Sequence, residues 1–234
     1  MIVINKINFP IYGIVILLSI LIGLVFNYLF IKKNNIKEKN ALLYLFLLFV
    51  YSFIGGLLLN SIVNFDVKNY SIGLSSYGGA IGVLICAVIF EKMNDSNGKY
   101  IKSAILSLPL MYSISKLACF FSGCCYGIPY NGVFSVVYTD GLNISLLPIQ
   151  LIETIVFMIV FIICYLNNNN KNIIPITMLL SAISKFILDF FRYSHLNEVL
   201  SINQVISIIF VIIGISIYFK EKNKNTNTKE LKVI

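Results

Sequence analysis

An all-α fold is predicted for this chain: a polytopic membrane protein built as a bundle of seven transmembrane helices. Of its 234 residues, 58% are hydrophobic and only 12% are charged, whereas a soluble domain is roughly half apolar and about a quarter charged. Apolar stretches of about 20 residues recur along the chain, long enough to cross a hydrocarbon core of roughly 30 Å. We expect the spans at residues 10–31, 41–63, 72–90, 101–121, 147–166, 173–191 and 201–219.

The first apolar run is expected to stay in the protein as a membrane anchor. A cleavable signal peptide has a shorter hydrophobic region and a small-residue cleavage site, whereas this run is longer and ends in the basic segment KKNNIKEKN. The sequence shows no soluble domain and no internal repeat. We therefore expect one membrane domain over residues 1–219 and a basic cytoplasmic tail over residues 220–234.

The basic residues predict how the spans are oriented. Thirteen of the 18 lysine and arginine residues lie on one side of the spans, in the loops 31–40, 91–102 and 167–172 and in the tail. The opposite side carries Lys6, Lys68 and Arg192, and two more lysines lie inside spans. Because cytoplasmic loops are enriched in Lys and Arg, we expect the N-terminus outside and the C-terminus in the cytoplasm. The net charge of +8 thus reflects topology, and no nucleic-acid partner is expected.

Polar and ionisable residues inside the spans fall at one depth. At about 1.5 Å per residue, they lie roughly 3–10 Å below the predicted outer boundary. An ionisable group inside a span is costly unless it is paired or hydrated, so each one is a candidate functional residue. They come from four or five spans and are Tyr77, Lys116, Gln150, Glu153, Lys185, Asp189 and Gln204. We expect a polar cavity that opens to the outer leaflet.

Two interpretations of these charges stay open. Lys185, Asp189 and Arg192 are spaced so that they share one helix face. The pairs Lys185–Asp189 and Lys116–Glu153 could be neutralising ion pairs that hold the bundle together. Alternatively, two lysines at one depth suit an anion such as a lipid phosphate, for which lysine serves as a point charge.

Two glycine-containing segments border the expected cavity. The stretch YGGAIG places Gly78, Gly79 and Gly82 close together, where they can line the cavity or simply permit close helix packing. The stretch GCCYGIP cannot remain regular helix, and irregular backbone at membrane depth needs protein or water to satisfy its polar groups. We expect a folded extracytoplasmic loop over residues 122–146.

The five cysteines show no spacing typical of a zinc site, so no metal is expected. Cys86 and Cys164 are predicted to be small core residues. Cys119, Cys124 and Cys125 lie on the predicted oxidising side. A structural disulfide from Cys119 to either neighbour and a reactive thiol beside a lysine both stay open.

Four motifs, in order and on the predicted topology, resemble the prolipoprotein diacylglyceryl transferase (Lgt) family over nearly the whole chain. YGGAIGV at 77–83 resembles the family's H-G-G-L-I-G, and SKLACFFSGCCYGIP at 115–129 is similar to its signature G-R-I-G-N-F-x-N-G-E-x-x-G-R. LPIQLIE at 147–153 is similar to H-P-x-Q-L-Y-E, and SKFILDFFR at 184–192 is similar to G-R-F-x-x-E-F-F-R.

The resemblance implies a reaction at the outer leaflet of the bacterial plasma membrane. The family moves diacylglyceryl from phosphatidylglycerol to the cysteine thiol of a prolipoprotein, which forms a thioether and releases glycerol phosphate. The implied partners are a phospholipid donor and a prolipoprotein or exported peptide as acceptor, and no cofactor is implied.

Matched position by position, the resemblance also implies roles for single residues. Lys116 and Lys185 stand at family arginines that engage the lipid phosphate, and Tyr77 stands at a histidine implicated in activating the thiol. The implied substrate-binding residues are Gly78, Gly79, Cys119, Gly123, Gly127, Gln150, Glu153, Asp189 and Arg192. Cys119 replaces an asparagine of the signature, and Asp189 replaces a glutamate.

These replacements leave a second function open. The two Arg→Lys changes keep the charge but lose bidentate geometry, and tyrosine titrates near pH 10, far above the value of about 6.5 for histidine. They favour a paralogue that binds lipid or a lipopeptide partner without transferring a group. His195, in the loop after Arg192, is an alternative base.

Overall fold

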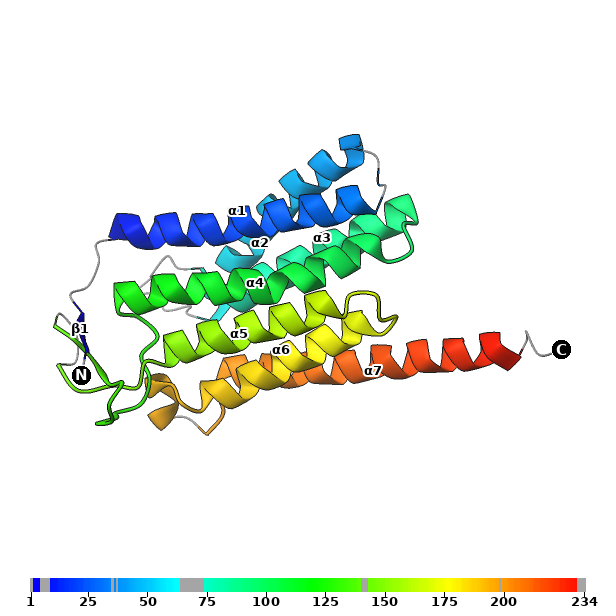
Figure 1. Ribbon diagram of the computed structural model, residues 1–234. Coiled ribbons are helices and arrows are strands. Elements are labelled where there is room, and N and C mark those ends of the chain that lie inside the picture. Colours follow the sequence, from blue (N-terminus) through cyan, green and yellow to red (C-terminus); the bar gives the residue numbers. More distant parts are fainter. Residues whose placement is uncertain are drawn as a thin grey trace. The chain divides into compact units, whose positions relative to one another are not determined.

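The computed structural model describes residues 2–4, 9–34, 36, 38–63, 74–139, 143–197 and 199–230 (Figure 1). Within these residues the chain forms seven α-helices, one 3-10 helix and two short strands. In chain order they are β1 (Ile2–Ile4), α1 (Phe9–Lys33), α2 (Glu38–Val63), α3 (Ser76–Asn94), α4 (Lys99–Ser122), β2 (Val136–Tyr138), α5 (Ile149–Leu166), α6 (Ile173–Asp189), η1 (Tyr193–Asn197) and α7 (Ile202–Glu230). The predicted all-α fold is confirmed.

Six helices of the described chain, α1 to α5 and α7, are long and apolar enough to cross a membrane. The exception is α6, because its 17 residues extend only about 25 Å. It packs against both α5 and α7 and runs antiparallel to them, so it returns the chain to the end at which α5 begins (Figure 1). The chain is therefore a multi-pass membrane protein, as its composition predicts.

Several helix boundaries differ from the predicted spans, most clearly the start of α3 and the end of α7. α3 begins at Ser76 instead of residue 72, because the Ser75 hydroxyl caps it by accepting a hydrogen bond from Gly78 N at 3.4 Å. α7 continues as a helix to Glu230, beyond the end of the predicted span at 219. Much of the predicted tail is thus helical. Four basic residues used to predict the topology lie outside the described residues: Lys6, Lys37, Lys68 and Lys232.

The chain divides into two compact units. The first unit comprises Met1–Tyr12 and Lys116–Ile234, and the second unit comprises Gly13–Ser115. Their boundaries fall inside α1 and α4, so the last turns of α4 belong to the first unit. Every pair of elements and every site described below lies within one unit.

In the second unit, α2 and α3 cross at glycines. Gly78 and Gly82 are one helix turn apart on the face of α3 that meets α2. A Cβ at Gly82 would overlap the carbonyl oxygen of Tyr51, and a Cβ at Gly78 would overlap that of Gly55. These glycines therefore permit close helix packing, one of the two roles expected for their motif.

The basic loops before α2 and after α3 share one end of the second unit. Asn40 Nδ2 donates a hydrogen bond to Asn94 Oδ1 at 2.8 Å, and Lys99 Nζ donates to the carbonyl oxygen of Asn34 at 3.0 Å. The described parts of these two loops thus lie on one side of the spans, as the topology prediction requires within this unit.

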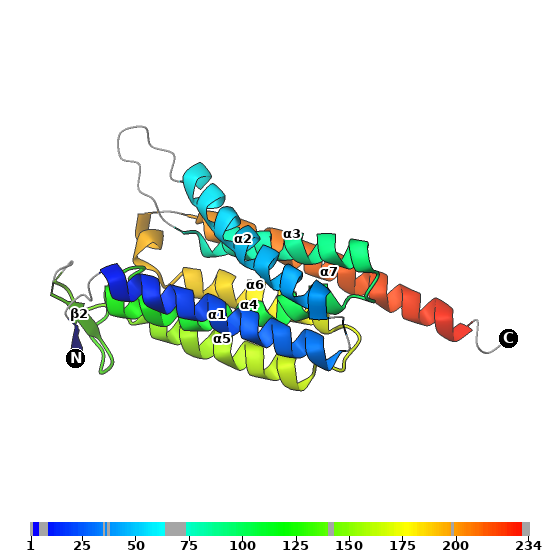
Figure 2. The same cartoon turned by 90° about the horizontal axis from the view of Figure 1, so that it is seen from above.

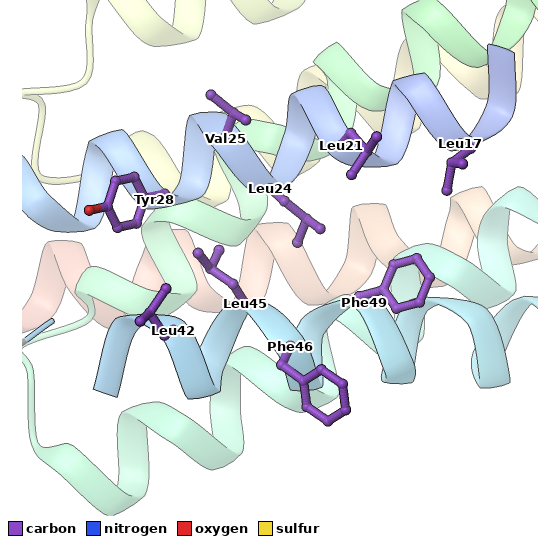
Figure 3. Close-up of a pocket in the computed structure, with 9 residues that line it drawn as sticks. All are labelled: Leu17, Leu21, Leu24, Val25, Tyr28, Leu42, Leu45, Phe46 and Phe49. Atoms are coloured by element: carbon purple, nitrogen blue, oxygen red, sulfur yellow. The ribbon is translucent and has the colours of Figure 1, made fainter. Parts of the chain in front are cut away.

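A groove of about 560 Å³ runs between α1 and α2 on the second unit. Figure 3 shows side chains from both helices lining it: Leu17, Leu21, Leu24, Val25, Tyr28, Leu42, Leu45, Phe46 and Phe49. Only the Tyr28 hydroxyl among them is polar. The groove holds none of the predicted site residues, so it carries none of the polar chemistry expected from the sequence.

In the first unit, the loop between α4 and α5 contains β2 (Figure 2) and is folded by isolated backbone bridges. β2 pairs in parallel with β1. Val136 and Leu146 exchange backbone hydrogen bonds of 3.0 and 2.9 Å, and Pro129 bridges to Leu146 as well. α4 ends at Ser122, where the glycine-rich stretch begins. The predicted break of the helix into a folded loop is confirmed.

The helix crossing predicts opposite effects for two Gly→Ala substitutions. Gly82→Ala should lower the free energy of unfolding by about 1–3 kcal/mol, because its methyl group would overlap a backbone carbonyl oxygen. Gly13→Ala in α1 meets nothing within 4 Å and should raise that free energy by up to about 1 kcal/mol through helix propensity. Thermal unfolding of both variants in detergent measures the difference, and equal losses would contradict the crossing.

Candidate functional site

One buried carboxylate, that of Glu153 in α5, contacts three cationic side chains. Lys185 Nζ lies 2.7 Å from Oε1 and Lys116 Nζ lies 3.3 Å from Oε2. Arg192 Nη2 lies 2.8 Å from Oε1 and 3.0 Å from Oε2. Glu153 is fully buried and the three cations are 4–8% exposed. Buried charges are tolerated only when they are paired and hydrogen-bonded, so this carboxylate makes the burial of the three cations possible.

Asp189 is the second carboxylate of the site. Its Oδ1 lies 3.3 Å from Lys185 Nζ and 3.3 Å from Arg192 Nε, and its Oδ2 accepts a hydrogen bond from the Ser201 hydroxyl. Lys185 and Asp189 share one face of α6 as predicted, whereas Arg192 lies outside the helix and contacts Asp189 from there. Arg192 reaches that face from three residues beyond the end of α6.

Ser201 also caps α7. Its hydroxyl accepts a hydrogen bond from Gln204 N at 3.1 Å, and Ser201 N donates to Gln204 Oε1 at 3.0 Å. This reciprocal pair is a capping box. One buried hydroxyl thus begins α7 and holds Asp189. Sequence reasoning missed Ser201, although the pattern S-x-x-Q before an apolar run could have revealed it.

Arg192 is held in place by the loop that follows α4. Backbone hydrogen bonds of 2.9 and 3.0 Å flank an antiparallel bridge between Gly127 and Arg192. A Cβ at Gly127 would overlap the carbonyl oxygen of Leu147, so the bridge requires glycine. The loop therefore sets the position of one of the three cations.

Gln150 lies one helix turn before Glu153 and is fully buried. Its Nε2 donates a hydrogen bond to the carbonyl oxygen of Cys124 at 2.6 Å, which ties the loop to α5. Its Oε1 is buried and meets no hydrogen-bond donor among the described residues. The site thus presents a buried acceptor one turn from the shared carboxylate.

The five residues Lys116, Glu153, Lys185, Asp189 and Arg192, here called the charge cluster, do not neutralise one another. Three cations face two carboxylates, which leaves one excess positive charge. The ion pairs expected under the first interpretation form, whereas binding of an anion by the two lysines stays a prediction. Because the excess charge lies away from water, its attraction for an anion is stronger than at a surface.

Most of the predicted site residues come together in the first unit: Lys116, Cys119, Gly123, Gly127, Gln150, Glu153, Lys185, Asp189 and Arg192. Tyr77, Gly78 and Gly79 belong to the second unit, in the first turn of α3. The catalytic role of Tyr77 stays a prediction. His195 stacks on the ring of Phe190, with centroids 4.8 Å apart, and its role as an alternative base also stays a prediction.

Comparison with known proteins decides the family. A family described as prolipoprotein diacylglyceryl transferase matches residues 1–220. The chain belongs to this family. The phosphatidylglycerol–prolipoprotein diacylglyceryl transferase of Clostridium tetani is 26% identical over 226 residues, which are 88% of this chain and 91% of the relative. Its counterpart in Finegoldia magna is 26% identical over 235 residues, 94% of each chain, and that of Clostridioides difficile is 31% identical over 166 residues, 68% and 66% of the two chains.

The resemblance read from the Lgt motifs is thereby confirmed, and the charge cluster draws on three of the four. Lys116 lies in the motif at 115–129 and Glu153 in that at 147–153, while the other members lie in the motif at 184–192. The fold thus brings charged residues from three separate motifs together at one carboxylate. The motifs thus mark one site and not three.

Removing the shared negative charge should destabilise the fold. Glu153→Gln removes the carboxylate that contacts all three buried cations, and should lower the free energy of unfolding by about 3–5 kcal/mol. The matched control is Asp95→Asn, at an exposed carboxylate that caps the C-terminus of α3 outside the cluster, and it should change that free energy by no more than about 0.5 kcal/mol. Thermal unfolding in detergent compares the two variants, and similar losses in both would rule out the central role of Glu153.

Proposed function

We propose that this chain is a phosphatidylglycerol–prolipoprotein diacylglyceryl transferase that works at the outer face of a bacterial plasma membrane. The names of its relatives support this reaction. The observation that carries the proposal is the excess positive charge of the buried charge cluster. The phosphodiester of an anionic phospholipid carries one negative charge, so it would neutralise that cluster.

Lys116 is the cation best placed to take up a phosphate oxygen. Its 3.3 Å contact with Glu153 is longer than the 2.7 and 2.8 Å contacts of Lys185 and Arg192 with the same carboxylate. Lysine carries a compact charge on a flexible stem, which allows a change of partner. Lys185 shares the same carboxylate and would stabilise a second phosphate oxygen.

In the proposed reaction, the acceptor thiolate attacks the glyceryl carbon that bears the phosphate. A carbon–sulfur bond forms while the carbon–oxygen bond breaks, and the electron pair of the broken bond leaves with glycerol phosphate. The acceptor thiol loses its proton to water, since a free cysteine is already a few per cent thiolate near neutral pH. Negative charge builds on the departing phosphate, where Lys116 and Lys185 would stabilise it.

Two further residues would position the reactants. Gln150 Oε1 is a buried acceptor without a donor among the described residues, so it suits a headgroup hydroxyl or the acceptor thiol. Tyr77 would donate a hydrogen bond to the phosphate and would not act as a base, because tyrosine titrates near pH 10.

A second candidate function is a paralogue that binds lipid or a lipopeptide partner without transfer. The replacement of family arginines by Lys116 and Lys185, and of the family histidine by Tyr77, favours it. Lysine binds phosphate as a point charge without the bidentate fork of arginine. The two candidates share the phosphate site and differ only in whether glycerol phosphate leaves.

The proposed site predicts the effect of single lysine substitutions on transfer. In a bacterial strain depleted of its own Lgt, the wild-type chain should restore lipidated prolipoprotein. Lys116→Ala and Lys185→Ala should each reduce transfer by at least about 100-fold. Lys171→Ala removes an exposed loop lysine and should leave transfer unchanged.

The same assay separates the two candidates. Wild-type chain that is well expressed but gives no lipidation would favour binding without transfer. Alanine variants as active as Lys171→Ala would contradict the role of the charge cluster. The double variant Lys116→Arg/Lys185→Arg restores the family residues, and it should retain transfer if phosphate binding is the role of both lysines.

The proposed orientation predicts which cysteines an impermeant maleimide reaches in intact cells. The exposed Cys125 should be labelled from outside, because its loop is proposed to face outward. Lys222→Cys, placed in a Cys124→Ser/Cys125→Ser background, should be labelled only after the cells are permeabilised. Labelling of Lys222→Cys in intact cells would reverse the proposed orientation.

A further inference from the structure

The last turn of α4 closes in a Schellman motif that brings two cysteines together. Cys124 N donates a hydrogen bond to the carbonyl oxygen of Cys119 at 3.1 Å, and Gly123 N donates to that of Phe120 at 3.4 Å. This is the pair of bonds that defines the motif. Gly123 takes the left-handed φ of +60° that the motif requires. The helix end thus folds the chain back over Cys119.

The third cysteine joins them because the backbone turns again. Cys125 has a φ of +55°, also left-handed. The Sγ atoms of Cys119, Cys124 and Cys125 all lie within 4.8 Å of one another. We call these three residues the thiol cluster. All three are free thiols. Cys86 and Cys164 are free as well, but they lie in other helices.

The spacing of the three sulfur atoms suits a common metal ion. With metal–sulfur distances of about 2.3 Å, tetrahedral coordination separates sulfur ligands by roughly 3.8 Å. Separations within 4.8 Å therefore need to close by at most about 1 Å. A disulfide would use only two of the sulfurs and would leave the convergence of the third unexplained.

A cationic side chain lies close to the thiol cluster. Lys116 lies one helix turn before Cys119 on α4, and a nearby cation favours the thiolate form that binds metal ions.

The cluster is both held and accessible. Cys119 is buried, Cys124 is half-buried and Cys125 is exposed, so an ion can enter from the Cys125 side. Gln150 fixes the carbonyl oxygen of Cys124 at 2.6 Å, which keeps the turn in place. A pre-formed set of ligands binds a metal ion without the conformational-entropy cost of ordering the loop.

We propose that Cys119, Cys124 and Cys125 bind a thiophilic metal ion of the Zn²⁺ class, with water as the fourth ligand. The absence of any zinc-like spacing led us to expect no metal from the sequence. That expectation relied on the usual spacings of zinc sites, whereas here a Schellman turn, which hydropathy and spacing do not reveal, assembles the ligands. The proposal is independent of the transferase reaction.

The test is a titration of the purified full-length chain in detergent, kept reduced, with Cd²⁺ as the probe. Sulfur-to-cadmium charge-transfer absorption should saturate at one ion per chain, and Zn²⁺ should displace the Cd²⁺. Cys125→Ser and Cys119→Asn should each weaken binding by roughly 100-fold or more, since even second-shell changes cost about 10–100-fold. Cys86→Ser and Cys164→Ser, the matched controls, should bind as tightly as the wild-type chain.

Three outcomes would overturn the proposal. The first is the lack of a charge-transfer band with Cd²⁺ in a reduced chain whose cooperative unfolding shows that it is folded. The second is Cd²⁺ binding that survives Cys125→Ser, a change at an exposed position that leaves the fold intact. The third is binding that the two control substitutions weaken as much as the thiol-cluster substitutions do.

Discussion

The carboxylate of Glu153 is the constraint on which the first unit depends. Three cations from α4, from α6 and from the segment after α6 converge on its two oxygen atoms. Each of those cations, buried alone, would cost several kcal/mol. One shared acceptor at full burial lets all three stay charged away from water. The ends of three chain segments are therefore tied to one side chain, and the loops between them must adapt to that geometry.

Different backbone devices deliver the partners of Glu153. Lys116 arrives on the last turns of α4, just before the Schellman motif that ends the helix. Arg192 arrives through the bridge to Gly127, where no side chain beyond glycine fits. Asp189, which steadies two of the cations, is held by the hydroxyl that caps α7. The helix ends and the loop are thus parts of the charged site, and a change in either reaches the cations.

Much of this arrangement could be predicted from the sequence, and the reason for each gap is physical. Hydropathy located the helices because a span must be apolar over its length, and depth along the spans grouped Lys116, Glu153 and Lys185. The sequence could not show that the Glu153 carboxylate contacts all three cations, because tertiary packing determines those contacts. The thiol cluster also escaped prediction, because two left-handed residues after α4 create it.

The charge balance connects the fold to the proposed chemistry. With one excess positive charge, the cluster becomes neutral when a phosphodiester binds, so the substrate complex carries no net buried charge. As the carbon–oxygen bond breaks, the phosphate gains negative charge that the diester lacked, and its attraction to the cations increases. An interaction that strengthens only as the reaction proceeds lowers the barrier, whereas one equally strong at the start does not. If these five residues included a third carboxylate, that difference would be lost, so we infer that their net positive charge is the feature that favours transfer over simple binding.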